Sequence, residues 1–591
     1  MRTTKTKSKR KLFFQIFNKS DETKIIINVF LYYGLRVLLL SYGIIRIFLI
    51  NIFLGITNFG LLNVMMLITP ICLFFITASQ SKSNYVLYKY ALENDYLSLN
   101  RVISEQIREM RYFTFISLFF LGFMLIISYF FVNSPGLNGT IACLLILGNS
   151  IGTISFGLVL PYVRWYLNSI NLNFIYDIWE IGFITILNAI CFGIIIAFGK
   201  HVINFDNVSY EQGSTYIVLI VTFLLSSRVM FANFALNLLK KRYMPWFKKQ
   251  KIKSKKIFNK NTISYLSQQF FETIAVSLIP IVFFIFTTFI HLATAIAGIY
   301  YSYTTFVLII SLLGWVISAV KPYLAKYMAS HSKNEIYKLN KFFSFSFIYI
   351  GVFLLIEFIL ISPYIMVFMA SYFSFWFAFL IGAYSLVTVI KTIDETFIYL
   401  DGKPEKYWKL TIIEIFIGLV VIIVSCIVVI AIKSLNNNIL NLLYAVLVSE
   451  LLMSISKYVL NIIYLNKLVY KKTFARFIHD YWLIYLYICF VMIVIICTIS
   501  MSQFVYSVQN TFTTNTKLNI FSNGSINVIM NNNIHLINYW NAFLSIIIIG
   551  VIFGICTAVI EVAFVKAITM YVNQIWSIVI SYLHFRRKEI N

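Results

Sequence analysis

The feature that most constrains this chain is a series of fourteen apolar stretches, each of about 20 residues or more. A helix of that length crosses the hydrocarbon core of a bilayer, and the stretches lack the two-residue alternation of membrane strands. Charged residues make up only 12% of the chain, against about 25% in soluble domains, which excludes a soluble protein. We therefore predict an all-α integral membrane protein with fourteen transmembrane helices: 25–54, 58–80, 113–133, 140–160, 176–198, 215–238, 263–289, 292–319, 342–362, 373–395, 410–432, 441–464, 481–502 and 541–566.

The excess of positive charge indicates the orientation of the chain. There are 48 Lys and Arg against 22 Asp and Glu, a net charge of +26. In a soluble protein this charge would suggest nucleic acid as a partner. Here most of the positive residues lie in the segments between the predicted spans. If the N-terminus is inside, all but six of the 48 lie in inner segments or at inner helix ends, and 240–260 alone holds ten. This bias predicts a multi-pass bacterial cell membrane protein with both termini cytoplasmic and no nucleic acid partner.

A short internal repeat predicts the arrangement of the spans. Gly60 and Gly298 each open a span that runs inward, and each span is followed by a basic amphipathic linker. From Gly60 to Asn100 is 40 residues, and from Gly298 to Asn340 is 42. Spans 1–6 and 7–12 would then form two six-helix lobes in parallel repeat, followed by two C-terminal helices. Parallel repeats of this kind are typical of transporters, which bind substrate at the repeat interface.

The predicted domains follow these spans. The linkers 81–112 and 320–341 are expected to lie as amphipathic helices at the inner surface. The Asn-, Thr- and Ser-rich loop 503–540 is expected to be external and loosely ordered. The boundaries are a basic cytoplasmic N-terminus (1–24), an N-lobe (25–239), a basic cytoplasmic linker (240–262), a C-lobe (263–465), helices 13 and 14 with the external loop (466–566) and a cytoplasmic amphipathic tail (567–591).

Four motifs occur in order along residues 25–465. They are Arg46 with Phe53-Leu54-Gly55 and Phe59-Gly60-Leu61, then Gly298-Ile299-Tyr300-Tyr301-Ser302, then Ile361-Ser362-Pro363-Tyr364-Ile365, and finally Tyr399-Leu400-Asp401-Gly402-Lys403. In this order the chain resembles the polysaccharide (oligosaccharide) flippases of the superfamily that also holds the multidrug-and-toxin extruders and the lipid II flippases. The resemblance implies that spans 1, 2, 7 and 8 line a central cavity. The chain is longer than is usual for that family.

Arginines within span 1 are the first candidate site. An ionisable group at mid-bilayer costs about 2.5–3.5 kcal/mol on insertion scales, so it is a functional candidate by default. Arg36 and Arg46 are ten residues apart, which separates them by about 80° around a helix axis, so they share a broad face. Guanidinium groups bind phosphate in a bidentate manner, which favours a diphosphate site at these two residues. The alternative is that both snorkel or pair within the bundle.

Glu272 in span 7 is predicted to lie at a depth similar to that of Arg36. If the two helices face each other, this pair is a gate or a coupling-ion site. The alternatives are a static salt bridge and no contact. Tyr300 and Tyr301, at the outer end of span 8, are candidates for contact with sugar.

The other charges within spans suggest structural ion pairs. Arg228 in span 6 is predicted to pair with Glu180 or Asp177 in span 5. Glu450 and Lys457 in span 12 are seven residues apart, on one helix face, and Glu414 lies near the inner end of span 11. These three residues are assigned to a packing network.

These features predict a flippase that moves a polyprenyl-diphosphate-linked oligosaccharide outward by alternating access, for surface polysaccharide export. Its partners would be that substrate, membrane lipid and polysaccharide assembly proteins. One alternative is a cation-coupled multidrug exporter of the same superfamily, which would favour acids over arginines in span 1. Another is a membrane polymerase or glycosyltransferase, although 503–540 contains no Asp, Glu or Arg. The sequence has no enzyme motif and no ligand spacing among its six His, so no catalytic residue, metal or cofactor is expected.

Overall fold

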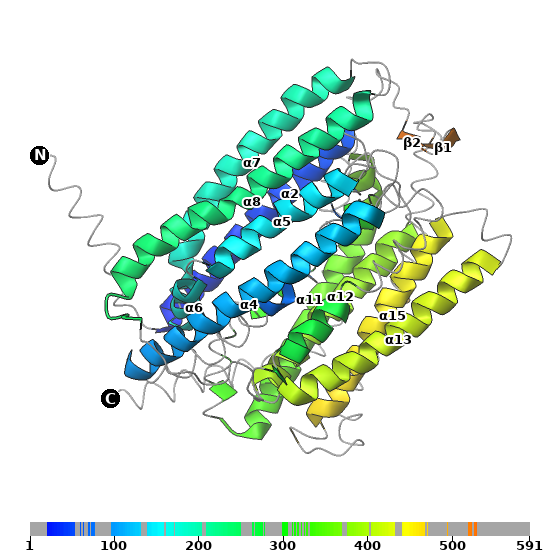
Figure 1. The fold of residues 1–591 in the computed structure, drawn as a ribbon. Helices are drawn as coiled ribbons and strands as arrows, with labels where there is room; N and C mark the ends of the chain where they lie inside the picture. The colour runs from blue at the N-terminus through cyan, green and yellow to red at the C-terminus, as the bar shows by residue number, and fades with distance from the viewer. Residues whose placement is uncertain are drawn as a thin grey trace, which may run out of the picture.

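The computed structural model consists almost wholly of long helices (Figure 1). It describes residues 21–53, 96–131, 139–158, 161–170, 172–203, 209–249, 331–368, 375–400, 404–431, 440–466, 518–522 and 525–528, and scattered positions within 60–76 and 263–328 and at 470 and 493. The helices are α2 (Asp21–Phe53), α4 (Tyr96–Phe131), α5 (Gly139–Leu158), α6 (Pro161–Ser169), α7 (Asn173–Ile203), α8 (Ser209–Tyr243), α11 (Lys333–Phe368), α12 (Phe375–Leu400), α13 (Pro404–Ala431) and α15 (Leu440–Tyr464).

The prediction of an all-α, multi-pass membrane protein is confirmed. Within the described part of the chain, eight helices are long and apolar enough to cross a membrane. The predicted spans 481–502, apart from Ile493, and 541–566 lie outside the described residues, as do 1–20, the linker segment 250–262 and the tail 567–591.

The helices pack as two bundles, one on each side of the molecule in Figure 1. In the N-lobe, α4 packs on α5, α5 on α8 and α8 on α7, with α2 against α7. In the C-lobe, α11 packs on α12, α12 on α15 and α15 on α13. The third, fourth, sixth and fifth spans of each half therefore follow one another in the same spatial order, which is the parallel repeat that the sequence predicts.

The repeat extends to a buried polar pair on α4 and α11, which have 36 residues each. Asn100 and Asn340 are both buried, and each is followed four residues later by a buried serine. Ser104 donates a hydrogen bond to the backbone carbonyl of Asn100, and Ser344 donates one to the Asn340 side chain.

These two helices correct the prediction of separate surface linkers at 81–112 and 320–341. From Tyr96 and from Lys333, the end of each linker continues without a break into the following span. Neither junction contains a proline or a glycine, so nothing in the sequence ends the helix. At the start of α11, Ser332 and Glu335 form a capping box in which the Ser332 backbone N–H donates to the carboxylate at 2.9 Å.

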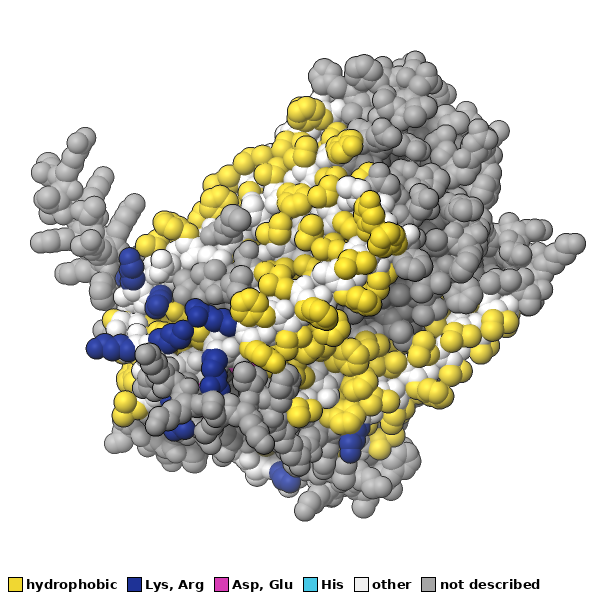
Figure 2. Space-filling model, in the orientation of Figure 1, with side chains coloured by type: hydrophobic (Ala, Val, Ile, Leu, Met, Phe, Trp, Pro, Cys, Tyr) yellow, Lys and Arg dark blue, Asp and Glu magenta, His cyan; other side chains and the backbone are white. Residues whose placement is uncertain are grey.

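Basic side chains mark one end of the bundles. Figure 2 shows that they gather where α4 begins and α8 ends, whereas hydrophobic side chains cover the length of the helices. The last turn of α8 contributes Lys240, Lys241 and Arg242. This end is called the basic end below. The exposed apolar side chains along the helices, such as Phe119 on α4 and Phe416 on α13, suit contact with lipid.

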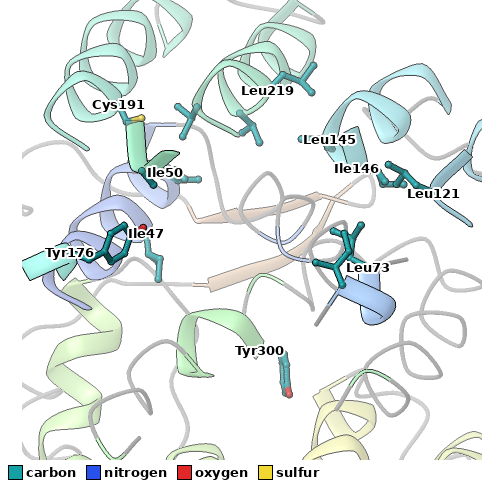
Figure 3. Close-up of a cluster of buried hydrophobic side chains, with 14 of the residues drawn as sticks. Ile47, Ile50, Leu73, Leu121, Leu145, Ile146, Tyr176, Cys191, Leu219 and Tyr300 are labelled. Carbon is teal, nitrogen blue, oxygen red and sulfur yellow. The ribbon is translucent and has the colours of Figure 1, made fainter. Parts of the chain in front are cut away.

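The two lobes meet at more than one level. Phe113 of α4 packs with Leu266 of the C-lobe, and the ring of Phe74 lies 5.1 Å from that of Phe270. One cluster of buried apolar side chains joins Ile47 and Ile50 of α2 to Cys191 of α7 and to Tyr300 and Phe377 of the C-lobe. Figure 3 shows part of this cluster. A second cluster holds the C-lobe helices α11 and α12 together.

The loop 503–540 contains regular structure that was not predicted. Strands β1 (Leu518–Ser522) and β2 (Ser525–Val528) pair in an antiparallel hairpin, with Leu518 opposite Val528. The intervening sequence, Asn523-Gly524, is a pair that strongly favours two-residue hairpin turns.

Candidate functional site

Two arginines of the N-lobe lie within electrostatic range of each other. Arg46 on α2 is partly buried and lies near Cys191 on α7, and its charge is repelled by that of Arg228 on α8, whose side chain is exposed. Three helices therefore converge on this position. Tyr42, one turn before Arg46, fixes α2 against α7, because its hydroxyl donates to Thr185 Oγ1 at 2.8 Å.

Glu180, one of the two predicted partners of Arg228, contacts Arg164 of the short helix α6 at 3.8 Å. The Arg164 guanidinium also lies over the Tyr176 ring, 4.7 Å from its centroid. The sequence pattern did not indicate the short helix α6, so it did not indicate that Arg164 of α6 contacts α7. Asp177 is fully buried, and its pairing with Arg228 stays a prediction.

Arg36 lies on α2, nearer the basic end than Arg46, and its side chain is half-buried. Glu272 accepts a hydrogen bond from Gln268 at 3.1 Å and lies within electrostatic range of Lys321. A contact between Arg36 and Glu272 stays a prediction.

Tyr300 has a role that the sequence did not indicate. The side chain is 7% exposed, and its hydroxyl donates to Glu450 Oε1 on α15 at 2.6 Å. Tyr301 packs edge-to-face on Tyr300, with ring centroids 5.0 Å apart. The two tyrosines therefore surround a buried carboxylate. Their proposed contact with sugar stays a prediction.

Ser302, which follows Tyr300 and Tyr301 in the chain, contacts the other lobe. Asn51, near the end of α2, donates from Nδ2 to Ser302 Oγ at 3.5 Å. Both side chains are buried. The segment 300–302 thus contacts α15 in the C-lobe through Tyr300 and α2 in the N-lobe through Ser302.

A buried ion network links three C-lobe helices. Glu414 on α13 accepts from Lys391 on α12 at 2.9 Å and from Lys457 on α15 at 3.2 Å. Thr411 is a further hydrogen-bond partner of Lys457. Lys457 therefore bonds Glu414 of α13, whereas Glu450, on the same helix as Lys457, bonds Tyr300.

The carboxyl group of Glu450 has fewer partners than that of Glu414. Its side chain is 3% exposed, and Oε2 has no hydrogen-bond partner among the described residues. Burying an ionised carboxylate without a partner is costly, so a proton or a cation is expected to neutralise it. Among the described residues no three His, Cys, Asp or Glu gather in a way that would hold a metal ion.

Comparison with known proteins gives the fold. No protein-family model matches the chain, and no curated protein matches its sequence. The crystal structure of a MATE protein in complex with MaL6 has a TM-score of 0.50 at 11% identity, over 76% of this chain and 97% of that chain. A MOP superfamily transporter from Pyrococcus furiosus has a TM-score of 0.49 at 11% identity, over 78% and 98%. The chain therefore has the fold of that MATE protein.

Proposed function

We propose that this chain is a flippase that moves a polyprenyl-diphosphate-linked oligosaccharide from the inner to the outer leaflet of a bacterial cell membrane. The observation that carries the proposal is the arginine pair of Arg46 and Arg228. The two like charges repel each other, and an anion bound by both guanidinium groups would relieve that repulsion. A diphosphate has the charge and the oxygen acceptors to bind both guanidinium groups. Arg36 extends the same cationic side of α2 toward the basic end.

The proposed mechanism is alternating access of the two lobes. In this mechanism the sugar lies between the lobes and the lipid tail lies outside them. The basic end faces the cytoplasm, in agreement with the positive-inside rule. An inside-negative membrane potential favours outward movement of an anion by about 2.3 kcal/mol per charge and 100 mV. Polysaccharide assembly proteins are the expected partners downstream.

The test is flux of a fluorescent lipid-linked oligosaccharide into the outer leaflet of proteoliposomes. Replacing Arg46 or Arg228 with Ala removes a charge-assisted contact worth about 1.5–3 kcal/mol, so flux is expected to fall about tenfold or more. Arg46→Lys should retain part of the flux, because the charge remains.

Arg101→Ala is the matched control, because Arg101 is exposed on α4 and, among the described residues, forms an ion pair with Glu105 alone. It should transport at the wild-type rate. Unchanged flux in both Arg46→Ala and Arg228→Ala, at equal insertion, would contradict the proposal.

The second candidate is a cation-coupled exporter of lipophilic cations, and the buried Glu450 favours it. A carboxylate beneath Tyr300 and Tyr301 could hold a proton, or a cation against the aromatic faces. Here Glu450→Gln should abolish uptake of a cationic dye driven by a proton or sodium gradient, whereas Arg46→Ala should leave it intact. The two candidates thus predict opposite effects for the same pair of variants.

A further inference from the structure

Aromatic side chains from three elements meet at the basic end of the N-lobe. The rings of Tyr96 and Tyr166 lie 5.2 and 5.4 Å from that of Trp246, and the ring of Tyr162 lies 5.1 Å from that of Phe247. Tyr96 begins α4, Tyr162 and Tyr166 belong to α6, and Trp246 and Phe247 follow α8. We call these five residues the aromatic collar.

Local hydrogen bonds hold the collar in shape. After α8, the Met244 N–H donates to the Lys240 carbonyl and the Phe247 N–H donates to the Met244 carbonyl, which turns the chain back over α6. The indole N–H of Trp246 also donates to the Tyr166 hydroxyl. Tyr162 and Tyr166 are buried, whereas Trp246 and Phe247 are partly exposed. The collar is therefore a built surface with one accessible side.

Basic side chains from the end of α8 and the residues after it lie beside the collar. Lys240 Nζ lies 5.7 Å from the ring centroid of Tyr162 and 5.6 Å from that of Phe247, so aromatic faces hold its charge. The other basic residues are exposed: Lys241, Arg242, Lys248 and Lys249. Within the described part of the chain, none of these five basic residues forms an ion pair. The whole stretch 240–262 contains no Asp or Glu.

The acids on neighbouring elements are already engaged. Glu180 on α7 contacts Arg164, and Glu105 on α4 contacts Arg101. The collar therefore keeps a surplus of positive charge beside an aromatic surface, at the end of helices that cross the bilayer. Tyr and Trp favour the headgroup level of a membrane, and clustered Lys and Arg attract anionic lipid there.

We propose that the aromatic collar and the five basic residues beside it, Lys240, Lys241, Arg242, Lys248 and Lys249, form a binding site for the headgroup of an anionic glycerophospholipid in the cytoplasmic leaflet. The phosphate contacts Lys240, Lys248 and Lys249, while the glycerol backbone lies against Trp246 and Phe247. The site joins α4, α6 and α8, so a bound lipid fastens the basic ends of three N-lobe helices together. The site is distinct from the arginine pair and does not depend on which substrate the protein transports.

The first test measures direct contact through tryptophan fluorescence. The full-length protein is placed in micelles with brominated phosphatidylglycerol or brominated phosphatidylcholine, because bromine quenches a nearby indole. The wild type should be quenched more by the anionic lipid. That excess should disappear in Trp246→Phe, because the reporter at the collar is lost.

The second test neutralises three lysines beside the collar. The triple variant Lys240→Gln, Lys248→Gln, Lys249→Gln should bind phosphatidylglycerol about tenfold more weakly in native mass spectrometry and lose the increase in Tm that this lipid gives. The matched control neutralises three exposed lysines of the C-lobe: Lys333→Gln, Lys338→Gln and Lys409→Gln. The control should bind the lipid as the wild type does.

Three results would overturn the proposal. The first is equal quenching by the two brominated lipids. The second is an equal loss of phosphatidylglycerol in the control triple variant, which would mean that only the total charge matters. The third is inorganic phosphate reproducing the increase in Tm, which would indicate a site for small anions. None of these results depends on transport, so the proposal and the proposed function can fail separately.

Discussion

Glu414 shows how a single residue can organise a lobe. Its side chain is 2% exposed and stands between Lys391 and Lys457, which come from two other helices. A buried charge is tolerated when opposite charges and hydrogen bonds surround it, and removing one partner leaves the others uncompensated. With Glu414 in place, one carboxylate is shared by two ammonium groups. Without it, two lysines would stand side by side in an apolar bundle.

Replacing Glu414 with Gln is therefore expected to destabilise the C-lobe by about 3–5 kcal/mol. The measurement is the thermal unfolding temperature in detergent. The control is Glu105→Gln, which removes an exposed i,i+4 pair worth about 0.3–0.5 kcal/mol and should leave that temperature nearly unchanged. The double variant Glu414→Gln, Lys457→Met should recover part of the loss, because it removes one stranded charge. Equal unfolding temperatures for Glu414→Gln and the wild type would contradict this account.

The same residues show what the sequence could predict at this scale. That Glu450 and Lys457 are unusual could be predicted, because each is an ionisable residue within an apolar span. Glu414 could be assigned to the same packing network, but which side chain each residue contacts could not be predicted, because helical spacing only places Glu450 and Lys457 on one face of α15. The partners Tyr300 and Glu414 come from other segments. The rotation of neighbouring helices about their axes decides such contacts, and no local pattern encodes it.

At the scale of elements, α11 and α12 pack closely through two glycines. A Cβ added to Gly382 of α12 would overlap the Leu355 side chain of α11, and one added to Gly351 of α11 would overlap Leu386 of α12. Leu355 is 2% exposed, so it has little room to move. The missing side chains thus set the distance between the two helices.

Gly382→Ala should therefore destabilise the C-lobe by about 1–3 kcal/mol, through overpacking. Gly182→Ala is the matched control on α7, because nothing lies within 4 Å of the added Cβ. There the substitution should stabilise the protein by about 0.5–1 kcal/mol, since alanine favours helix more than glycine does. The measurement is again thermal unfolding in detergent. A higher unfolding temperature for Gly382→Ala than for Gly182→Ala would refute the packing argument.

Long elements were predictable and short ones were not. The apolar stretches that became α7 and α13 are long enough to allow only a membrane helix. Helix α6 has nine residues and lies between two spans, although Pro161 at its first position is a helix-start signal. The hairpin of β1 and β2 was likewise missed, because the Asn-rich composition of the loop hid the turn signal Asn523-Gly524.

For the molecule as a whole, the repeat explains why two bundles can work as units. Within each lobe, successive helices pack along their length in the same order. Between the lobes, the contacts of the segment 300–302 and the apolar cluster around Ile50 and Tyr300 lie toward one end. Tyr300 is tied to Glu450 within the C-lobe, while Ser302 bonds the N-lobe. A rigid-body motion of the lobes would thus break the contact of Asn51 with Ser302 and leave contacts within each lobe intact.

This separation predicts that a bond across the lobes stops transport and a bond within one lobe does not. In a variant whose seven native cysteines are replaced, Asn51→Cys with Ser302→Cys should form a disulfide on oxidation, since the side chains meet at 3.5 Å. Oxidation should lower flux in proteoliposomes by about tenfold or more, equal to at least about 1.4 kcal/mol, and reduction should restore it.

Thr388→Cys with Ser454→Cys is the control, because these hydroxyls lie 3.4 Å apart on α12 and α15 of the same lobe. Its oxidation should leave flux unchanged, because two helices that move as one body lose nothing when joined. If the oxidised, cross-linked variant with cysteines at positions 51 and 302 transports as fast as its dithiol form, the lobes do not part at this contact. Loss of flux in both cross-linked variants would mean instead that motion within the C-lobe drives transport.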